Sequence, residues 1–185
     1  MRSSKWKWRA VMLALLFFAW LMREDRSIVG VGVNGVNHMQ NGNAIAQFYI
    51  NGGAYGNVGE GGGGGSHVCC VMLPEVWRPG LQIELKWELI DESVKKQVPY
   101  RAHVPVEKYD EVGDLVIHFF RNNKVRVVSS AYDVMSPNHP VGWSALEGGA
   151  LATEGIKIPV IFSEEELAKL VERDRPSAGW RWLGY

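Results

Sequence analysis

The sequence predicts a mainly β fold: an antiparallel β-sandwich with one C-terminal helix. The first reason is that residues 81–89 alternate apolar and polar side chains without a break, as a strand with one buried and one solvated face does. The second is a series of short apolar segments separated by turns rich in glycine, asparagine and proline. Short strands followed by a single late helix favour two packed sheets.

Turn residues place the boundaries of the other expected strands. Asn122-Asn123 predicts a tight hairpin turn, because asparagine tolerates positive φ. Arg78-Pro79-Gly80 predicts a type II turn, in which proline fixes φ and glycine accepts φ above zero. Trp77 is expected to cover the end of that hairpin. Besides 81–89, strands are expected at residues 44–50, 68–73, 114–120, 125–130 and 156–162.

The helix is predicted from its start signal and its apolar spacing. Ser163 and Glu166 form the Ser-x-x-Glu pattern of a capping box. Leu167, Leu170 and Val171 then recur at helical spacing, and Pro176 follows as a stop.

The N-terminus has the pattern of a signal peptide or a membrane anchor. Arg2, Lys5, Lys7 and Arg9 precede an apolar run at residues 10–22. A helix of that length would rise about 20 Å, short of the roughly 30 Å hydrocarbon core. We therefore divide the chain into a signal or anchor segment, 1–27, and a sandwich domain, 28–185. The excess of basic residues before the run predicts a periplasmic domain, either anchored to the inner membrane or soluble after cleavage.

The overall charge argues against nucleic-acid binding. Twenty acidic side chains balance twenty basic ones, whereas nucleic-acid binders carry a basic face.

Two glycine motifs resemble cofactor loops but lack the necessary context. Gly30 to Gly35 match G-x-G-x-x-G, yet turn residues follow where a helix N-terminus would have to hold the pyrophosphate. The run at 61–65 ends in Gly-Ser-His rather than the Gly-Lys-Ser/Thr of a phosphate loop. We expect no cofactor.

Cys69 and Cys70 are the only cysteines. Neighbouring strand residues point to opposite faces, so the two thiols are not expected to share a metal ion. Buried thiols are the commonest state for such residues. A disulfide between these neighbours, or one to another molecule, is the alternative in an oxidising compartment.

No catalytic pattern is evident, and we expect no enzyme activity. The five histidines show no metal-ligand spacing, and His118 alternates with Val116 and Phe120 as a sheet residue would. Ser144, in Gly142-Trp143-Ser144-Ala145-Leu146, lacks the final glycine of a nucleophile elbow and does not lie at an expected strand-to-helix turn.

A set of short motifs between residues 31 and 141 resembles a known family. The matching residues are Val33-Asn34, Phe48, Ile50-Asn51-Gly52, Gly56-Asn57-Val58, Gly62-Gly63-Gly64, Val68-Cys69-Cys70-Val71, Leu73-Pro74, Trp77-Arg78-Pro79-Gly80-Leu81, Trp87, Val106, Lys108-Tyr109, Gly113-Asp114-Leu115, His118-Phe119 and His139-Pro140. The family comprises exported bacterial proteins that contain a domain of unknown function. They are found beside phospholipase effectors of type VI secretion and act as their immunity proteins.

This resemblance implies a protein that binds and inhibits a cognate phospholipase in the periplasm. A structural or adhesive envelope module is the main alternative, and a carrier of small ligands or lipids is a weaker one. Recognition is expected in loops, which vary freely on a rigid sheet. The candidate loops are residues 59–67 and 135–147, with Gly62, Gly63, Gly64, His67, His139 and Trp143 as candidate contact residues.

Overall fold

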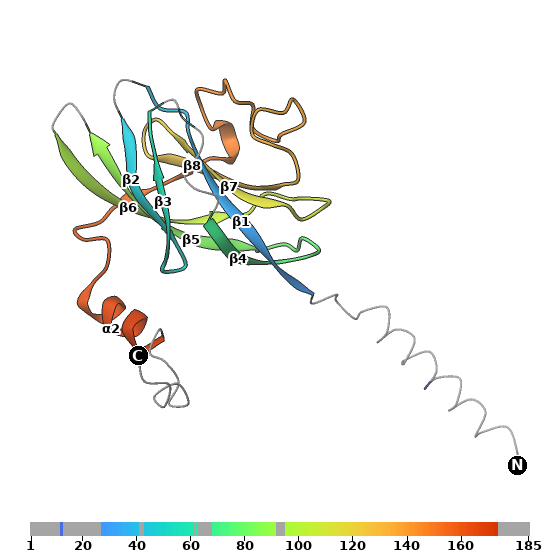
Figure 1. Ribbon diagram of the computed structural model, residues 1–185, viewed down its shortest axis with the longest axis horizontal. Helices are drawn as coiled ribbons and strands as arrows, with labels where there is room; N and C mark the ends of the chain where they lie inside the picture. Colours follow the sequence, from blue (N-terminus) through green and yellow to red (C-terminus); the bar gives the residue numbers. More distant parts are fainter. Residues whose placement is uncertain are drawn as a thin grey trace, which may run out of the picture.

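A computed structural model describes residues 12, 27–40, 43–60, 62, 68–91 and 95–173 (Figure 1). The predicted signal or anchor segment lies almost wholly outside these residues. Among the described residues, no helix has the length and apolar character needed to cross a membrane.

The described chain is mainly β. Its strands are β1 (Ile28–Asn37), β2 (Ala44–Ile50), β3 (Gly53–Val58), β4 (Val68–Pro74), β5 (Gln82–Asp91), β6 (Lys96–Pro105), β7 (Asp114–Phe120), β8 (Lys124–Ser130), β9 (Thr153–Glu154) and β10 (Ile156–Lys157). A 3₁₀ turn, η1 (Gly149–Leu151), precedes β9, and the C-terminal helix is α2 (Glu164–Arg173).

The strands form two five-stranded sheets in a sandwich-like arrangement. One sheet has the order β4-β1-β7-β8-β9 and the other β10-β6-β5-β2-β3. Most pairs are antiparallel, but β1 and β7 run parallel. The expectation of a purely antiparallel sandwich was therefore wrong at this pair. About eighty residues separate β1 from β7, so no hairpin fixes their relative direction.

The hydrophobic core lies between the two sheets. Phe119 of β7 packs against Phe48 of β2 and Trp87 of β5, with ring centroids 5.7 and 6.1 Å apart. All three side chains are buried. Burying each large apolar side chain contributes about 1.5–3 kcal/mol, so these inter-sheet contacts account for much of the stability of the domain.

The predicted turns occur where expected. Asn122 and Asn123 have φ of 58° and 56° between β7 and β8. Gly80 has φ of 81°, and the Leu81 N–H donates to the carbonyl of Arg78, as a type II turn requires. Trp77 packs at the edge of the core and donates its indole N–H to the Val106 carbonyl at 2.9 Å.

The predicted strand at residues 156–162 is shorter than expected. Only Ile156–Lys157 pairs with β6, although the Ile158 N–H still donates to the Pro99 carbonyl. Pro159 then has no N–H to continue the ladder. The chain leaves the sheet here and leads to α2.

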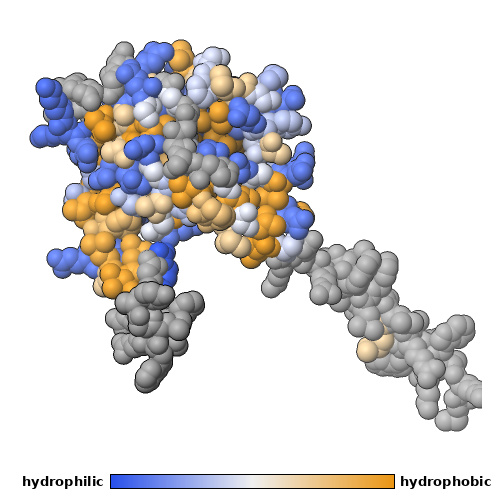
Figure 2. All heavy atoms as spheres, viewed as in Figure 1, coloured by the Kyte–Doolittle hydropathy of each residue, from blue (hydrophilic) through white to orange (hydrophobic). Residues whose placement is uncertain are grey.

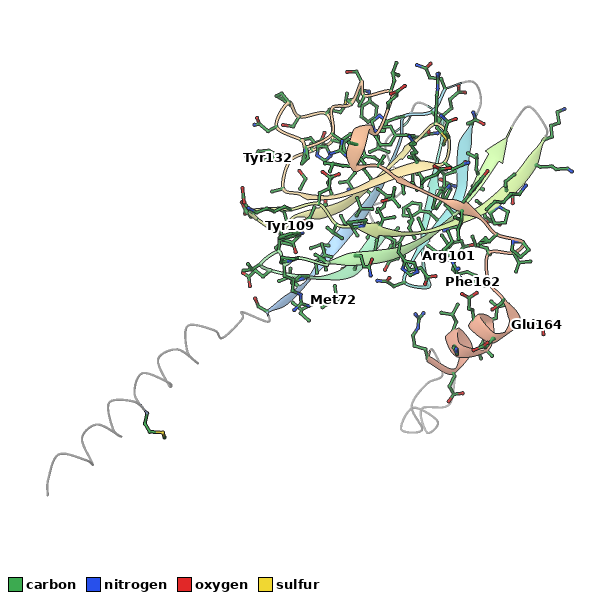
Figure 3. The ribbon with its side chains drawn as sticks, turned by 180° about the vertical axis from the view of Figure 1, so that it is seen from behind. Met72, Arg101, Tyr109, Tyr132, Phe162 and Glu164 are labelled. Atoms are coloured by element: carbon green, nitrogen blue, oxygen red, sulfur yellow. A yellow bond between two sulfur atoms is a disulfide. The ribbon has the colours of Figure 1, made fainter. Side chains whose placement is uncertain are left out.

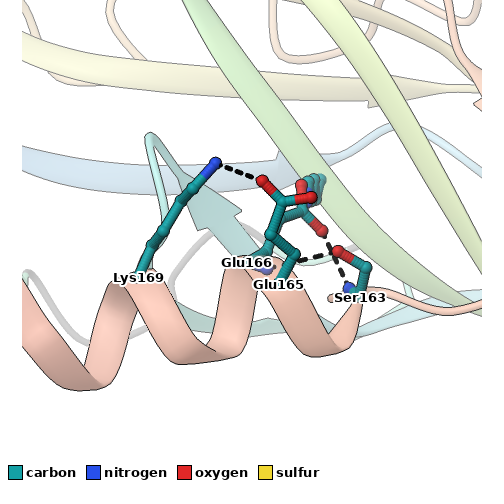
Figure 4. Close-up of polar contacts among 5 residues, drawn as sticks. Ser163, Glu165, Glu166 and Lys169 are labelled. Carbon is teal, nitrogen blue, oxygen red and sulfur yellow. Dashed lines mark hydrogen bonds and ion pairs between the residues drawn. The ribbon is translucent and has the colours of Figure 1, made fainter.

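The C-terminal helix begins with the predicted capping box (Figure 4). The Glu166 N–H donates to Ser163 Oγ at 3.2 Å, and the Ser163 N–H donates to Glu166 Oε2 at 2.8 Å. The other oxygen of Glu166 pairs with Lys86 of β5. Glu166 therefore links the helix to the outer face of the second sheet.

Candidate functional site

The outer face of the first sheet is covered by the contact loop, a name we give to residues 131–148. This loop follows β8 and lies on the side of the domain away from α2; Tyr132 marks its start in Figure 3. Its inner side chains pack on apolar residues of β1, β7 and β8, which form a second small core. That core contains Val36, Val116, Phe120, Val128 and Val141, with Val134 and Ala145 packed against it. The loop thus explains why β7 and β8 are apolar on both faces.

Three histidines from separate parts of the chain meet beneath the contact loop. His38 directly follows β1, His118 lies in β7, and His139 belongs to the loop itself; all three are buried. Their nitrogens form a continuous chain. His38 Nε2 lies 2.8 Å from His118 Nδ1, and His118 Nε2 lies 3.1 Å from His139 Nε2.

The chain of histidine nitrogens ends on a backbone carbonyl, and this determines which nitrogen of each ring carries the hydrogen. His139 Nδ1 lies 3.1 Å from the Tyr132 carbonyl, which can only accept. A neutral His139 therefore accepts at Nε2 from His118, and a neutral His118 accepts at Nδ1 from His38. Each neutral imidazole has one N–H. His38 therefore donates to His118, His118 donates to His139, and His139 donates to the Tyr132 carbonyl.

The environment of the histidines favours their neutral forms. Burial lowers the pKa of His118 to about 2, and the charges of His38, His139 and Arg126 act in the same direction. Burial also lowers the pKa of His38, against the effect of the Trp143 and Ala145 carbonyls beside its ring. It lowers the pKa of His139 too, against the effects of the Tyr132 carbonyl and Asp133.

The outer side of the contact loop is rich in large apolar side chains. Met135 is 70% exposed, and Tyr132, Trp143 and Leu146 are also accessible. Trp143 stands between two hollows of about 480 and 310 Å³, both of which also touch Val36 of β1. Asp114 and Asp133 line the larger hollow, and His38 lines the smaller. Apolar and aromatic groups beside a few polar ones are typical of a binding surface.

The candidate contact residues differ in how the structure places them. Trp143 is 38% exposed and suited to direct contact. His139 is only 5% exposed, so its ring holds the loop in place and does not present itself to a partner. Gly62 lies beside β1, where its carbonyl accepts from the Asn37 N–H at 2.9 Å. Gly63, Gly64 and His67 lie outside the described residues.

Asn37 and His38 bring the two predicted loops to the same end of β1. The Asn37 side-chain amide donates to the carbonyl of Gly59, at the start of the predicted loop 59–67, which we call the glycine loop. The next residue, His38, joins the contact loop through the histidine chain and lines the smaller hollow with Trp143 and Ala145 of that loop. The described beginning of the glycine loop and the contact loop therefore lie next to each other.

Cys69 and Cys70 are joined in a disulfide on the edge strand β4, and both residues are exposed. The favoured expectation of two buried thiols was therefore wrong, and the alternative of a disulfide between the two neighbours is the one that the structure has. The expected divergence of their side chains also fails, because their sulfur atoms are bonded to each other. The ladder between β1 and β4 shifts register here, since Val31 pairs with Val71 and Gly32 with Cys69. Cys70 is the extra residue of this bulge.

No metal centre is formed by the part of the chain that the structure describes. In that part, no set of three or more His, Cys, Asp or Glu residues is arranged to hold a metal ion. The three buried histidines direct their nitrogens at one another and at a carbonyl.

Comparisons with known proteins identify one domain. No curated protein and no solved structure matches the chain. Residues 36–127 match the family model described as protein of unknown function DUF3304. This range includes His38 and His118 and ends before the contact loop. At residues 36–127 the chain is therefore similar to a domain of unknown function.

Proposed function

We propose that this protein is a binding module whose recognition surface is the contact loop, together with the glycine loop, whose described beginning lies beside it. Following the family resemblance, its partner is a phospholipase effector of type VI secretion, which it occludes as an immunity protein in the periplasm. The protein contributes no chemistry of its own in this proposal. It protects the cell that makes it by covering the active site of the toxin.

The observation that carries the proposal is the two-sided construction of the contact loop. Its inner side is fixed by Val141 and His139, which are buried against the sheet. Its outer side exposes Tyr132, Met135 and Trp143. Aromatic residues and methionine are enriched at the centres of protein interfaces, and a fixed backbone reduces the entropy lost on binding.

The position of the loop relative to the family domain also supports a recognition role. The matched range ends at residue 127 in β8, and the contact loop begins four residues later. Loops on a rigid sheet can differ in sequence without disturbing the core. A shared scaffold carrying a separate recognition loop is suited to a protein that must match one particular toxin.

The direct test requires a lipase-like open reading frame next to the gene for this chain, and its absence would count against the proposal. The enzyme is exported to the periplasm with and without the 185-residue protein, and cell survival and phospholipid loss are measured. We expect survival to be restored and a stable complex to form between the purified proteins. A complex of standard size would bury about 1,200–2,000 Å². Unchanged killing without a complex would reject the immunity proposal and favour the structural or adhesive envelope module.

The proposed location has its own test. Alkaline phosphatase, which is active only outside the cytoplasm, is fused after Tyr185. We expect an active fusion, because the basic residues before the apolar N-terminal run favour retention of that end in the cytoplasm. An inactive phosphatase combined with an active cytoplasmic reporter at the same position would remove the case for a periplasmic partner.

A further inference from the structure

We propose that His38, His118 and His139 form an acid-sensitive latch: the neutral chain holds the contact loop on the sheet, and acidification releases the loop. The release itself concerns only this chain. Its consequence for a bound partner rests on the proposed function.

The latch joins the first sheet to the contact loop. His118 lies in the middle of β7, a central strand paired with both β1 and β8. His139 lies in the contact loop, 21 residues further along the chain. The bond between their Nε2 atoms therefore connects the rigid sheet to the loop. His139 is also held by the Tyr132 carbonyl, so its ring is fixed at both nitrogens.

A further proton cannot enter most of the docked chain without breaking a bond. A second proton on His139 would place an N–H at Nε2, opposite the N–H that His118 already directs at it. A second proton on His118 would likewise oppose the N–H of His38. At His38, the backbone of Trp143 and Ala145 favours an added proton. The docked loop therefore holds at most one extra proton, and burial opposes even that one.

The charged and aromatic groups around the three histidines do not change this limit of one extra proton. Arg126 of β8 lies opposite His118 in the ladder and disfavours a nearby positive charge, although Glu107 pairs with its guanidinium at 2.6 and 2.8 Å. Asp133 in the loop favours a charge on His139. The Phe120 ring stacks on His38 with centroids 4.6 Å apart and offers no hydrogen bond.

Released histidines bind protons freely, and this links loop docking to pH. Burial lowers the pKa of all three docked rings, whereas solvated rings titrate near their ordinary value. The stabilisation of the docked state is therefore complete above pH about 6.5 and is lost as pH falls below it. For one histidine that leaves with the loop, the docking equilibrium weakens roughly 25-fold between pH 7 and pH 5.

The test follows the ¹⁵N-labelled full chain by NMR between pH 7.5 and 5, in mild detergent because of its apolar N-terminal segment. We expect the Trp143 indole signal and the amide signals of the contact loop to move toward those of a mobile loop. Signals from β5, in the other sheet, are expected to stay unchanged. No loop transition above pH 5, or loss of all signals together, would overturn the proposal.

Two variants and one direct measurement separate the latch from general acid sensitivity. His139→Gln should abolish the loop transition, because glutamine does not titrate. His103→Gln, at an exposed position on β6, should keep it. If His139→Gln fails to fold, ¹⁵N signals of the wild-type imidazoles decide. The latch requires N–H at Nε2 of His118 at pH 7 and protonation of His139 in step with loop release; any other assignment rejects it.

A third measurement connects the latch to partner binding. The affinity for the lipase-like partner should fall over the same pH range in the wild type and change less in His139→Gln. If acid releases the loop but the lipase-like protein binds at no pH, the proposed function is rejected and the latch stands. Binding that is unaffected by loop release would reject the link between the two.

Discussion

Lys86 Nζ lies 2.6 Å from Glu166 Oε1, which joins the middle of one sheet to the C-terminal helix. Lys86 is only 4% exposed although it lies on the face of β5 that the alternating pattern assigns to solvent. The Phe162 ring covers its ammonium group at 4.7 Å. This charged pair and the Phe162 ring therefore help to hold α2 on the sheet.

Replacing Glu166 with Gln should loosen α2. Glutamine can still accept from the Ser163 N–H in the capping box, so the substitution mainly removes the charge opposite Lys86. Because Glu166 is partly exposed to water, we expect a loss of only about 1–2 kcal/mol in the free energy of unfolding. Urea denaturation measures this. Glu165→Gln, which breaks only the exposed pair with Lys169, is the matched control and should leave stability unchanged.

The same pair predicts a pH dependence. Hydrogen bonding to Lys86, helped by the Ser163 N–H, lowers the pKa of Glu166 to about 2. A carboxylate with a lowered pKa stabilises the folded state above its ordinary pKa, and this contribution is lost as pH falls from about 4.5 toward 2. In Glu166→Gln, the difference in stability from the wild type should therefore shrink over that range. A constant difference would contradict the assignment.

Gly113 allows the backbone of Ser130 and Ala131, where the contact loop begins, to pass close to its own Cα. A Cβ at this position would collide with the backbone of Ser130 and Ala131. Gly113 also exchanges two hydrogen bonds with Ser129 Oγ. Gly113→Ala should cost about 1–3 kcal/mol, as overpacking does. Gly142→Ala is the control within the loop, because its Cβ would meet no atom within 4 Å. Equal thermal stability of the two variants would refute the close-packing argument.

The disulfide between Cys69 and Cys70 should contribute little to stability. A bond between neighbouring residues closes almost no chain length, so it constrains the unfolded state only slightly. Both residues are exposed, and replacing them with serine leaves no cavity in the core. We expect the double serine variant to keep its melting temperature within a few degrees and to keep its protective activity. Alkylation and mass spectrometry should find two thiols only after reduction; two thiols before reduction would contradict the disulfide.

Local patterns predicted part of this fold, but β1, β3 and β6 were not expected. The strands at 44–50 and 114–120 occur at those residues, and the helix begins at the Ser163 cap. These features depend on neighbouring residues: alternation for a strand, and a side chain three positions away for a cap. A strand was expected over residues 156–162 because they are mostly apolar. It ends after Lys157, since Pro159 has no N–H to pair with the neighbouring strand.

The histidine chain could not be predicted from spacing. His38 and His118 are 80 residues apart and meet because β1 and β7 are parallel neighbours, a pairing that no local signal specifies. His139 joins them from a loop. Lys86 was likewise placed in solvent by alternation, since that pattern contains no information about a helix docking from a distant part of the chain. Long-range pairing, rather than local preference, determines both sites.

Trp143 should be the main anchor for the partner. It stands between the two hollows of the contact loop, and a partly exposed tryptophan beside pockets has the character of an interface hot spot. Trp143→Ala should weaken binding of the lipase-like partner by about 2 kcal/mol or more, roughly 30-fold. Val160→Ala, an exposed apolar position preceding α2, is the control and should bind as the wild type does. Calorimetric titration gives the affinities, and the NMR spectrum of each variant verifies that the sheets are intact. Equal affinity of the two variants, with both folded, would show that the contact loop is not the recognition surface.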